Sequence, residues 1–97
     1  MKILWSPQAR KDLNAIVARI AGDKPSAALK WTRAVHGKVS RLGRFPNSGR
    51  IVPELGRADI REIIIGSYRV IYKVGSFLSI LTVFHGTKDW KGDKTSL

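Results

Sequence analysis

Two arginines and a lysine run through a segment of strand-forming residues, REIIIGSYRVIYKV, at positions 61–74. Side chains alternate between the two faces of a β-strand, so Arg69 and Lys73 would share a face while the tyrosines and valines between them face the other way. Arg61 is the only cation on the preceding strand that could join them. We therefore expect Arg61, Arg69 and Lys73 to form a positive binding surface on an open sheet face, where an anionic partner can reach them.

The overall charge of the chain supports an anionic partner without identifying one. Lysine and arginine number 18 against 7 aspartate and glutamate residues, which gives a formal net charge of +11. Such a field attracts a polyanion or an acidic protein. The basic residues run from Lys2 to Lys94 without a block, so they indicate a basic folded surface rather than a detachable tail. The sheet cations are equally consistent with ordinary solvent-facing charges, partly paired with Asp59 and Glu62.

The two histidines differ in their surroundings. His85 ends a predicted strand in VFHGTKDW, where a histidine can act as a general base. His36 lies beside the apolar stripe of a predicted helix, and we interpret it as a structural or surface residue. The chain has no cysteine, and its sequence contains no paired carboxylates, no glycine-rich phosphate loop and no Gly-x-Ser-x-Gly motif. We therefore expect neither a metal site nor a cofactor.

Trp90 is the aromatic residue that fits no apolar pattern. It follows the last predicted strand and lies close to Lys88 and Asp89. An exposed tryptophan is costly, so this position indicates either a binding partner or a closing contact within the fold. Four other aromatic residues fall at positions that the helix and strand patterns assign to the core: Trp5, Trp31, Tyr68 and Tyr72.

Two amphipathic helices are predicted ahead of the main strands. Ser6 and Pro7 suit the N-cap and the first position of a helix, and apolar residues then recur at helical spacing up to Gly22, which we expect to end it. Pro25 suits the first position of a second helix, whose apolar stripe runs to Leu42. So short a connection predicts that the two helices lie antiparallel.

The hydrophobic period changes to two from Asp59 onward, where runs of β-branched and aromatic residues follow one another. Gly-Ser pairs at 66–67 and 75–76 are typical of tight hairpin turns, so these strands should form an antiparallel meander. Residues 1–5 are expected to add a further strand.

The fold class expected from these elements is α+β, because helices come first and strands after. We expect an N-terminal antiparallel helical hairpin packed on one face of a mainly antiparallel twisted β-sheet, in the order β-α-α-β-β-β. Residues 43–58 are predicted to be an ordered connection in which Ile51 and Val52 form an edge strand. The 97 residues suffice for one compact core, so residues 1–97 are expected to be a single domain.

The compartment is inferred from what the sequence lacks. The N-terminal residues MKILWSPQAR contain no apolar run long enough for a signal peptide, and no segment approaches the roughly 20 apolar residues that span a bilayer. A chain without cysteine also fits a reducing compartment. We therefore expect a cytoplasmic protein that does not associate with membranes.

The order of these elements and the sequences of several motifs resemble the RelE/ParE superfamily, the toxins of type II toxin–antitoxin modules of the plasmid stabilisation type. The resemblance covers nearly the whole chain, through the segments SPQARKDLNAIVARIAGDKPSAALKW, PNSGRIVPELG, DIREIIIGSYRVIYKV and ILTVFHGTKD. It implies a small basic toxin that a cognate acidic or amphipathic antitoxin neutralises. The antitoxin would lie along the helical hairpin or against an open sheet edge.

Two kinds of target occur in this superfamily. RelE-like members cleave mRNA in the ribosome without a metal, using cations and often an aromatic residue on the open sheet face. ParE-like members poison DNA gyrase and have no established nuclease activity. A third interpretation, a non-catalytic basic binding module or a decayed toxin, stays open beside these two.

The nuclease residues of the RelE-like members are matched only in part. Arg69 in SYR matches the arginine of the RelE-type GYR motif, Arg61 falls near the basic positions of the preceding strand, and Lys88 stands where many members carry arginine. The terminal tyrosine of the ribosome-dependent nucleases has no counterpart, since Trp90 cannot act as an acid or base. If the chain is a nuclease, Arg61, Arg69 and Lys88 with His85 for proton transfer would be catalytic. The incomplete set favours a ParE-like inhibitor of gyrase, for which Arg61, Arg69, Lys73 and Trp90 would be a binding surface.

Overall fold

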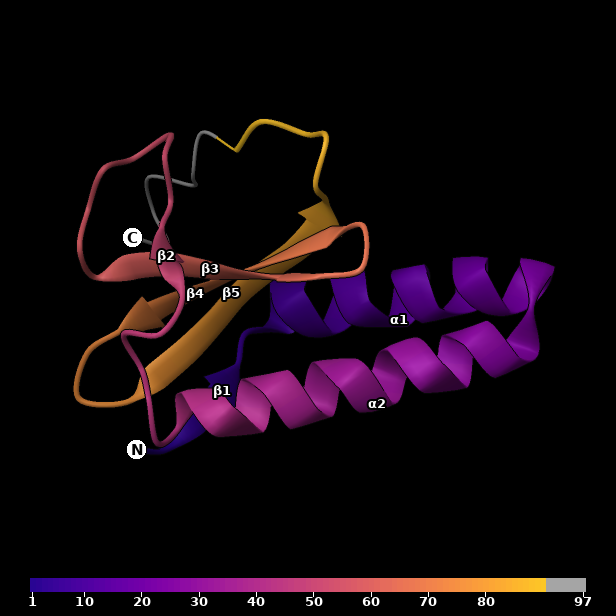
Figure 1. Cartoon of the computed structure of the whole chain (residues 1–97), viewed down its shortest axis with the longest axis horizontal. Helices are drawn as coiled ribbons and strands as arrows, with labels where there is room; N and C mark the ends of the chain where they lie inside the picture. The colour runs from indigo at the N-terminus through magenta and orange to yellow at the C-terminus, as the bar shows by residue number, and fades with distance from the viewer. Residues whose placement is uncertain (91–97) are drawn as a thin grey trace.

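The computed structural model describes residues 1–90, so Lys94 lies outside the described residues. Along the chain the elements are β1 (Ile3–Trp5), α1 (Pro7–Asp23), α2 (Pro25–Leu42), β2 (Arg50–Ile51), β3 (Ile60–Ile65), β4 (Tyr68–Val74) and β5 (Leu78–His85). The two helices lie antiparallel, and their hairpin reaches well beyond the sheet at its connecting end (Figure 1).

The strands form one mixed sheet in the order β1-β5-β4-β3-β2. Strands β2 to β5 pair antiparallel, whereas β1 pairs parallel with β5. The expected α+β fold is therefore confirmed, including the strand at the N-terminus. The predicted edge strand is also present as β2, although it contains Arg50 and Ile51 and stops before Val52, which is fully buried.

The predicted helix starts at Pro7 and Pro25 are confirmed, and the first has a side-chain cap. The Ser6 side chain accepts a hydrogen bond from the Ala9 backbone amide at 3.0 Å, and its hydroxyl donates to the Leu81 carbonyl at 2.8 Å. The first helix runs through Gly22 to Asp23, one residue beyond the expected end. Lys24 is extended because the residue before a proline is disfavoured in helical conformation, so Pro25 rather than Gly22 determines the break.

The main core lies between the helical hairpin and the sheet. It contains buried residues of α1, α2, β3, β4 and β5, including Trp31, Tyr68 and Tyr72, with Trp5 packed against it. The Tyr72 hydroxyl donates to the Pro46 carbonyl at 2.8 Å and accepts from the Gly49 amide at 2.9 Å. A Cβ at Gly49 would lie 2.4 Å from that hydroxyl oxygen, so only glycine fits there. These contacts fasten the connection between α2 and β3 to the sheet.

The face of the sheet opposite the helices carries a second apolar cluster. Val52, Ile60 and Ile71 are its buried members. Four partly buried residues pack against them: Leu55, Leu81, Phe84 and Trp90. The connection after β2 and the segment after β5 therefore cover part of the face that the sequence pattern predicted to be open.

The two hairpin turns differ in length. The first contains Gly66 and Ser67, and Gly66 has the positive φ of 61° that glycine adopts without strain. The second contains three residues, since β4 ends at Val74 and β5 begins at Leu78. A register shift between Ile71 and Tyr72 interrupts the pairing of β4 with β5.

Candidate functional site

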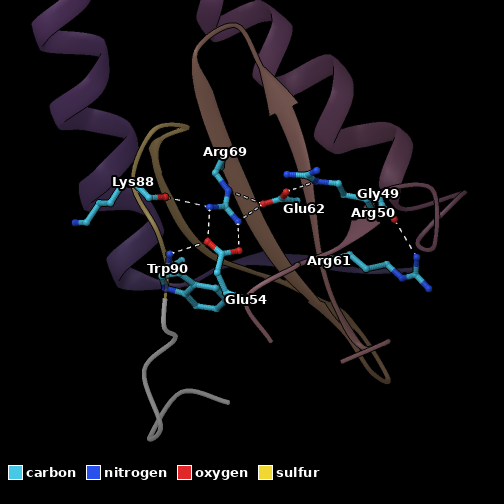
Figure 2. A network of polar contacts seen from close by, with 8 residues as sticks. All are labelled: Gly49, Arg50, Glu54, Arg61, Glu62, Arg69, Lys88 and Trp90. Carbon is cyan, nitrogen blue, oxygen red and sulfur yellow. Dashed lines mark hydrogen bonds and ion pairs between the residues drawn. The ribbon is translucent and has the colours of Figure 1, made fainter. Parts of the chain in front are cut away.

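Arg69 lies within the fold instead of on an open surface. Its side chain is only 6% exposed. Its Nη1 and Nη2 donate to the two carboxylate oxygens of Glu54 at 2.7 and 2.8 Å, and its Nε donates to Glu62 Oε1 at 2.6 Å (Figure 2). Nη1 also donates to the Lys88 carbonyl at 3.1 Å. All three nitrogens of the guanidinium are thus occupied, and the expectation that an anionic partner can reach Arg69 is wrong.

Glu62 completes the charge balance of this cluster. Its side chain is 0% exposed and receives hydrogen bonds from Arg69 on one oxygen and from Arg50 Nε on the other. The cluster of Arg50, Glu54, Glu62 and Arg69, which we call the ion-pair cluster, carries two positive and two negative charges. Buried charges are tolerated only when they are paired and hydrogen-bonded in this way.

The ion pairs shift the pKa values of Glu54 and Arg69. The hydrogen bonds from Arg69 and, to a smaller extent, from the Trp90 backbone amide, which donates to Glu54 Oε2 at 2.8 Å, together lower the pKa of Glu54 to about 2. The hydrogen bond to Glu54 in turn raises the pKa of the Arg69 guanidinium above its ordinary value. Both groups therefore stay ionised near neutral pH.

Arg61 does not share a face with Arg69, so the expected row of three cations is absent. The turn at Gly66 pairs Ile65 with Tyr68, and counting back along the ladder pairs Arg61 with Tyr72 on the helix-covered face. The alternation within β4 alone does not show on which face Arg61 lies. The Gly-Ser turn signal does, because the turn sets the register between β3 and β4.

The guanidinium of Arg61 binds backbone carbonyls of the loops on either side of β2. Nη1 donates to the Gly49 carbonyl at 2.9 Å and to the Asn47 carbonyl at 3.3 Å, and Nε donates to the Ala58 carbonyl at 3.0 Å. These bonds hold the connection that Tyr72 fastens from the other side. Lys73 does lie on the face of Arg69, opposite Ile60 in β3, and is half-buried.

The remaining predicted residues lie around the turn that follows β5. His85 and Lys88 are exposed, and His85 packs its ring against Tyr68 with 5.5 Å between centroids. Trp90 is half-buried against Phe84, so of the two roles predicted for it the described residues show a closing contact. His36 is exposed on α2.

The sequence interpretation missed Glu54, which binds both Arg69 and the backbone of Trp90. The composition could have indicated Glu54. The chain has only 7 acidic residues, so each carboxylate near a strand is a candidate partner for a buried arginine. While Glu54 occupies the guanidinium, Arg69 has no free donors for a phosphate. The ion-pair cluster is therefore suited to holding two segments on the sheet.

A groove of about 410 Å³ opens beside the C-terminal end of α2. Two cations of that helix, Lys38 and Arg41, line it together with Phe45, Ile63 and Ile64. Phe45 and Ile64 are 56% and 47% exposed, which is unusual for such large apolar side chains. Strand β2 pairs with Arg61 and Glu62, so within residues 1–90 no strand covers the last three residues of β3 at this edge.

Residues 1–90 contain neither a cluster of metal-ligand side chains nor a helix that could span a membrane. In this range no three His, Cys, Asp or Glu side chains gather as they would around a metal ion. No helix among these residues is both long and apolar enough to cross a membrane.

Comparison with known proteins identifies the family of the chain. The model of the ParE toxin family, toxins of the parDE type II toxin–antitoxin system, matches residues 3–90. A chain from the chromosomal ParDE toxin–antitoxin system of P. aeruginosa has a similar fold, with a TM-score of 0.72 and 24% sequence identity over 88% of this chain and 95% of that one. No curated protein matches. Since the family match spans almost the whole of the described fold, the chain belongs to the ParE toxin family of type II toxin–antitoxin systems.

Proposed function

We propose that this ParE-family toxin inhibits growth by poisoning DNA gyrase. The observation that supports this over mRNA cleavage is the sequestration of Arg69, which is 6% exposed and bound by Glu54 and Glu62. A RelE-like nuclease would use this arginine to bind the phosphate and stabilise developing charge. A phosphate could reach the guanidinium only by displacing a bidentate carboxylate. The chain, which lacks cysteine, would act in the cytoplasm.

Controlled expression in a bacterial host tests this proposal. DNA synthesis and protein synthesis are followed separately in the first minutes after induction. An early fall in DNA synthesis, together with accumulation of cleaved DNA when the purified protein is added to gyrase, is the expected result. An early fall in protein synthesis with mRNA cut inside codons would instead support the endonuclease, and normal growth would support a binding module or a decayed toxin.

We further propose that a cognate antitoxin of the ParD type neutralises the toxin by binding the groove beside α2. The exposed Phe45 and Ile64 offer apolar contacts, while Lys38 and Arg41 favour an acidic segment. The backbone of Ile64 points to the uncovered edge of β3, where its carbonyl accepts only the Lys38 ammonium at 3.4 Å among the described residues. An acidic amphipathic segment could add a strand at this edge.

Charge reversal in the groove is expected to weaken this complex selectively. Arg41→Glu combined with Phe45→Ser should raise the Kd for the antitoxin by about 100-fold, because a favourable charge contact becomes repulsive and an apolar anchor is lost. Arg33→Glu is the matched control, since Arg33 is exposed on the same helix and does not line the groove. Calorimetric titration with the product of the adjacent gene measures the Kd of each variant. If Arg33→Glu raised the Kd as much as the double variant, the groove would not be the docking site.

A further inference from the structure

A hollow of about 280 Å³ lies between α1 and the C-terminal end of β5. Three basic side chains line it and come from three different places: Arg19 from α1, His85 from the end of β5 and Lys88 from the turn that follows. Tyr68 adds an aromatic wall that contacts the His85 ring. The fold therefore brings together two residues predicted from the sequence and one, Arg19, that the sequence interpretation did not select.

We propose that this hollow, the phosphate hollow, binds a backbone phosphate of a nucleic acid. This goes beyond inhibition of gyrase, because it assigns the toxin a direct contact with nucleic acid at a defined place. Three donor groups around one concavity suit a phosphodiester, which offers two charged oxygens and two ester oxygens as acceptors. The net charge of +11, spread over the whole chain, favours an extended polyanion as the source of that phosphate.

The positive charges of Arg19 and Lys88 outnumber the single negative charge that lines the hollow. Among the described residues its one acidic lining residue is Asp12, whose carboxylate is already occupied. It accepts hydrogen bonds from the Gln8 amide at 2.8 Å, the Val83 backbone amide at 3.0 Å and the Thr82 hydroxyl. Within residues 1–90 none of the three basic side chains takes part in an ion pair. Their donors thus stay available to an incoming anion.

The His85 ring is oriented so that it can donate. The Thr87 backbone amide donates to His85 Nδ1 at 3.3 Å, and the Thr87 hydroxyl oxygen lies 2.8 Å from the same nitrogen. Because Nδ1 accepts from this amide, the proton of the neutral ring is assigned to Nε2. Nε2 then acts as a hydrogen-bond donor, which is what a phosphate oxygen requires.

Backbone hydrogen bonds and Arg69 of the ion-pair cluster hold the turn that carries His85 and Lys88. The Gly86 amide donates to the Ser67 carbonyl at 2.7 Å, and the Lys88 amide donates to the His85 carbonyl at 3.0 Å. Arg69 Nη1 binds the Lys88 carbonyl at 3.1 Å, while the Lys88 ammonium points away from Arg69 (Figure 2). Arg69 is therefore a positioning residue for the hollow and does not contact the anion itself.

Two double variants that lose the same net charge test the proposal. Arg19→Ala with Lys88→Ala removes two charges from the hollow, and Lys30→Ala with Arg33→Ala removes two exposed charges from α2. Binding to a fluorescent DNA duplex of about 20 base pairs is measured by anisotropy over a range of salt concentrations. The hollow variant is expected to bind at least about 10-fold more weakly, with a salt slope reduced by about 1 to 2, and the control less than about 3-fold more weakly.

Each other outcome of these measurements has a defined meaning. Equal weakening by both variants, with thermal melts showing both to be folded, would mean that only the diffuse positive field attracts DNA and would overturn the proposal. A hollow-dependent interaction with poly-glutamate but not with DNA or RNA would also overturn it, because the ligand would then be a protein carboxylate. Parallel titrations with duplex DNA and with RNA identify which nucleic acid supplies the phosphate. Since gyrase is absent from this assay, its result is independent of the proposed target.

Discussion

Arg69→Ala is expected to lower the free energy of unfolding by about 3 to 5 kcal/mol, because it removes one partner of a buried ion pair. Glu62 would keep its charge at 0% exposure with only Arg50 beside it. The loss would exceed that of an ordinary surface charge, which is below about 1 kcal/mol. Chemical denaturation followed by circular dichroism measures the difference.

Arg50→Ala is the matched control, since Arg50 binds the same carboxylate. Its side chain is 62% exposed, so its removal should cost no more than about 1 kcal/mol. Arg69→Leu combined with Glu62→Leu should recover most of the lost stability, because apolar residues of similar size can replace a buried pair at little cost. If Arg69→Ala were as stable as the unchanged chain, the ion-pair cluster would have no structural role.

The stability of the fold is also expected to fall as the pH drops from about 4.5 toward 2. The folded-state pKa of Glu54, about 2, lies below its ordinary value of 4.5, so the ionised carboxylate stabilises the fold at higher pH. This contribution is complete above the ordinary value and is lost as the pH falls through the folded value. Because the Glu54 side chain is 21% exposed, we expect it to amount to about 2 kcal/mol.

Glu54→Gln separates this contribution from other titrations. The variant should be less stable than the unchanged chain by about 2 kcal/mol at pH 7, and the difference should shrink to near zero by about pH 2. Urea denaturation of both chains between these limits gives the difference directly. A gap that stays constant with pH would show that Glu54 contributes through packing or amide contacts and that its charge is immaterial.

The burial of Arg69 changes which mutations can distinguish a nuclease from a gyrase inhibitor. Alanine at position 69 would lower any activity by destabilising the fold, so its effect cannot identify a catalytic role. Lys88 and His85 are exposed and can be replaced with far less risk to stability. Loss of mRNA cleavage in a folded variant at one of these positions would therefore identify a catalytic residue of an endonuclease.

Several features of the fold followed directly from local sequence patterns. The helix starts at Pro7 and Pro25, the antiparallel hairpin and the alternation within β4 all appear in the structure. These depend on capping, on proline geometry and on periodicity, which act over a few residues. The end of α1 was misplaced because the proline at position 25 restricts Lys24 more strongly than Gly22 favours a stop.

The sequence by itself determined the order of elements, the core-facing residues of the helices and of β4, and a strong excess of positive charge. It could not show what covers the second face of the sheet, because Glu54 and Trp90 reach it from segments without periodicity. Only the tertiary structure decided that Arg69 is enclosed by Glu54 and Glu62, that Arg61 faces the other side, and that Arg19, His85 and Lys88 line one hollow. The physical reason is that these positions depend on strand register and long-range ion pairing, which local patterning does not encode.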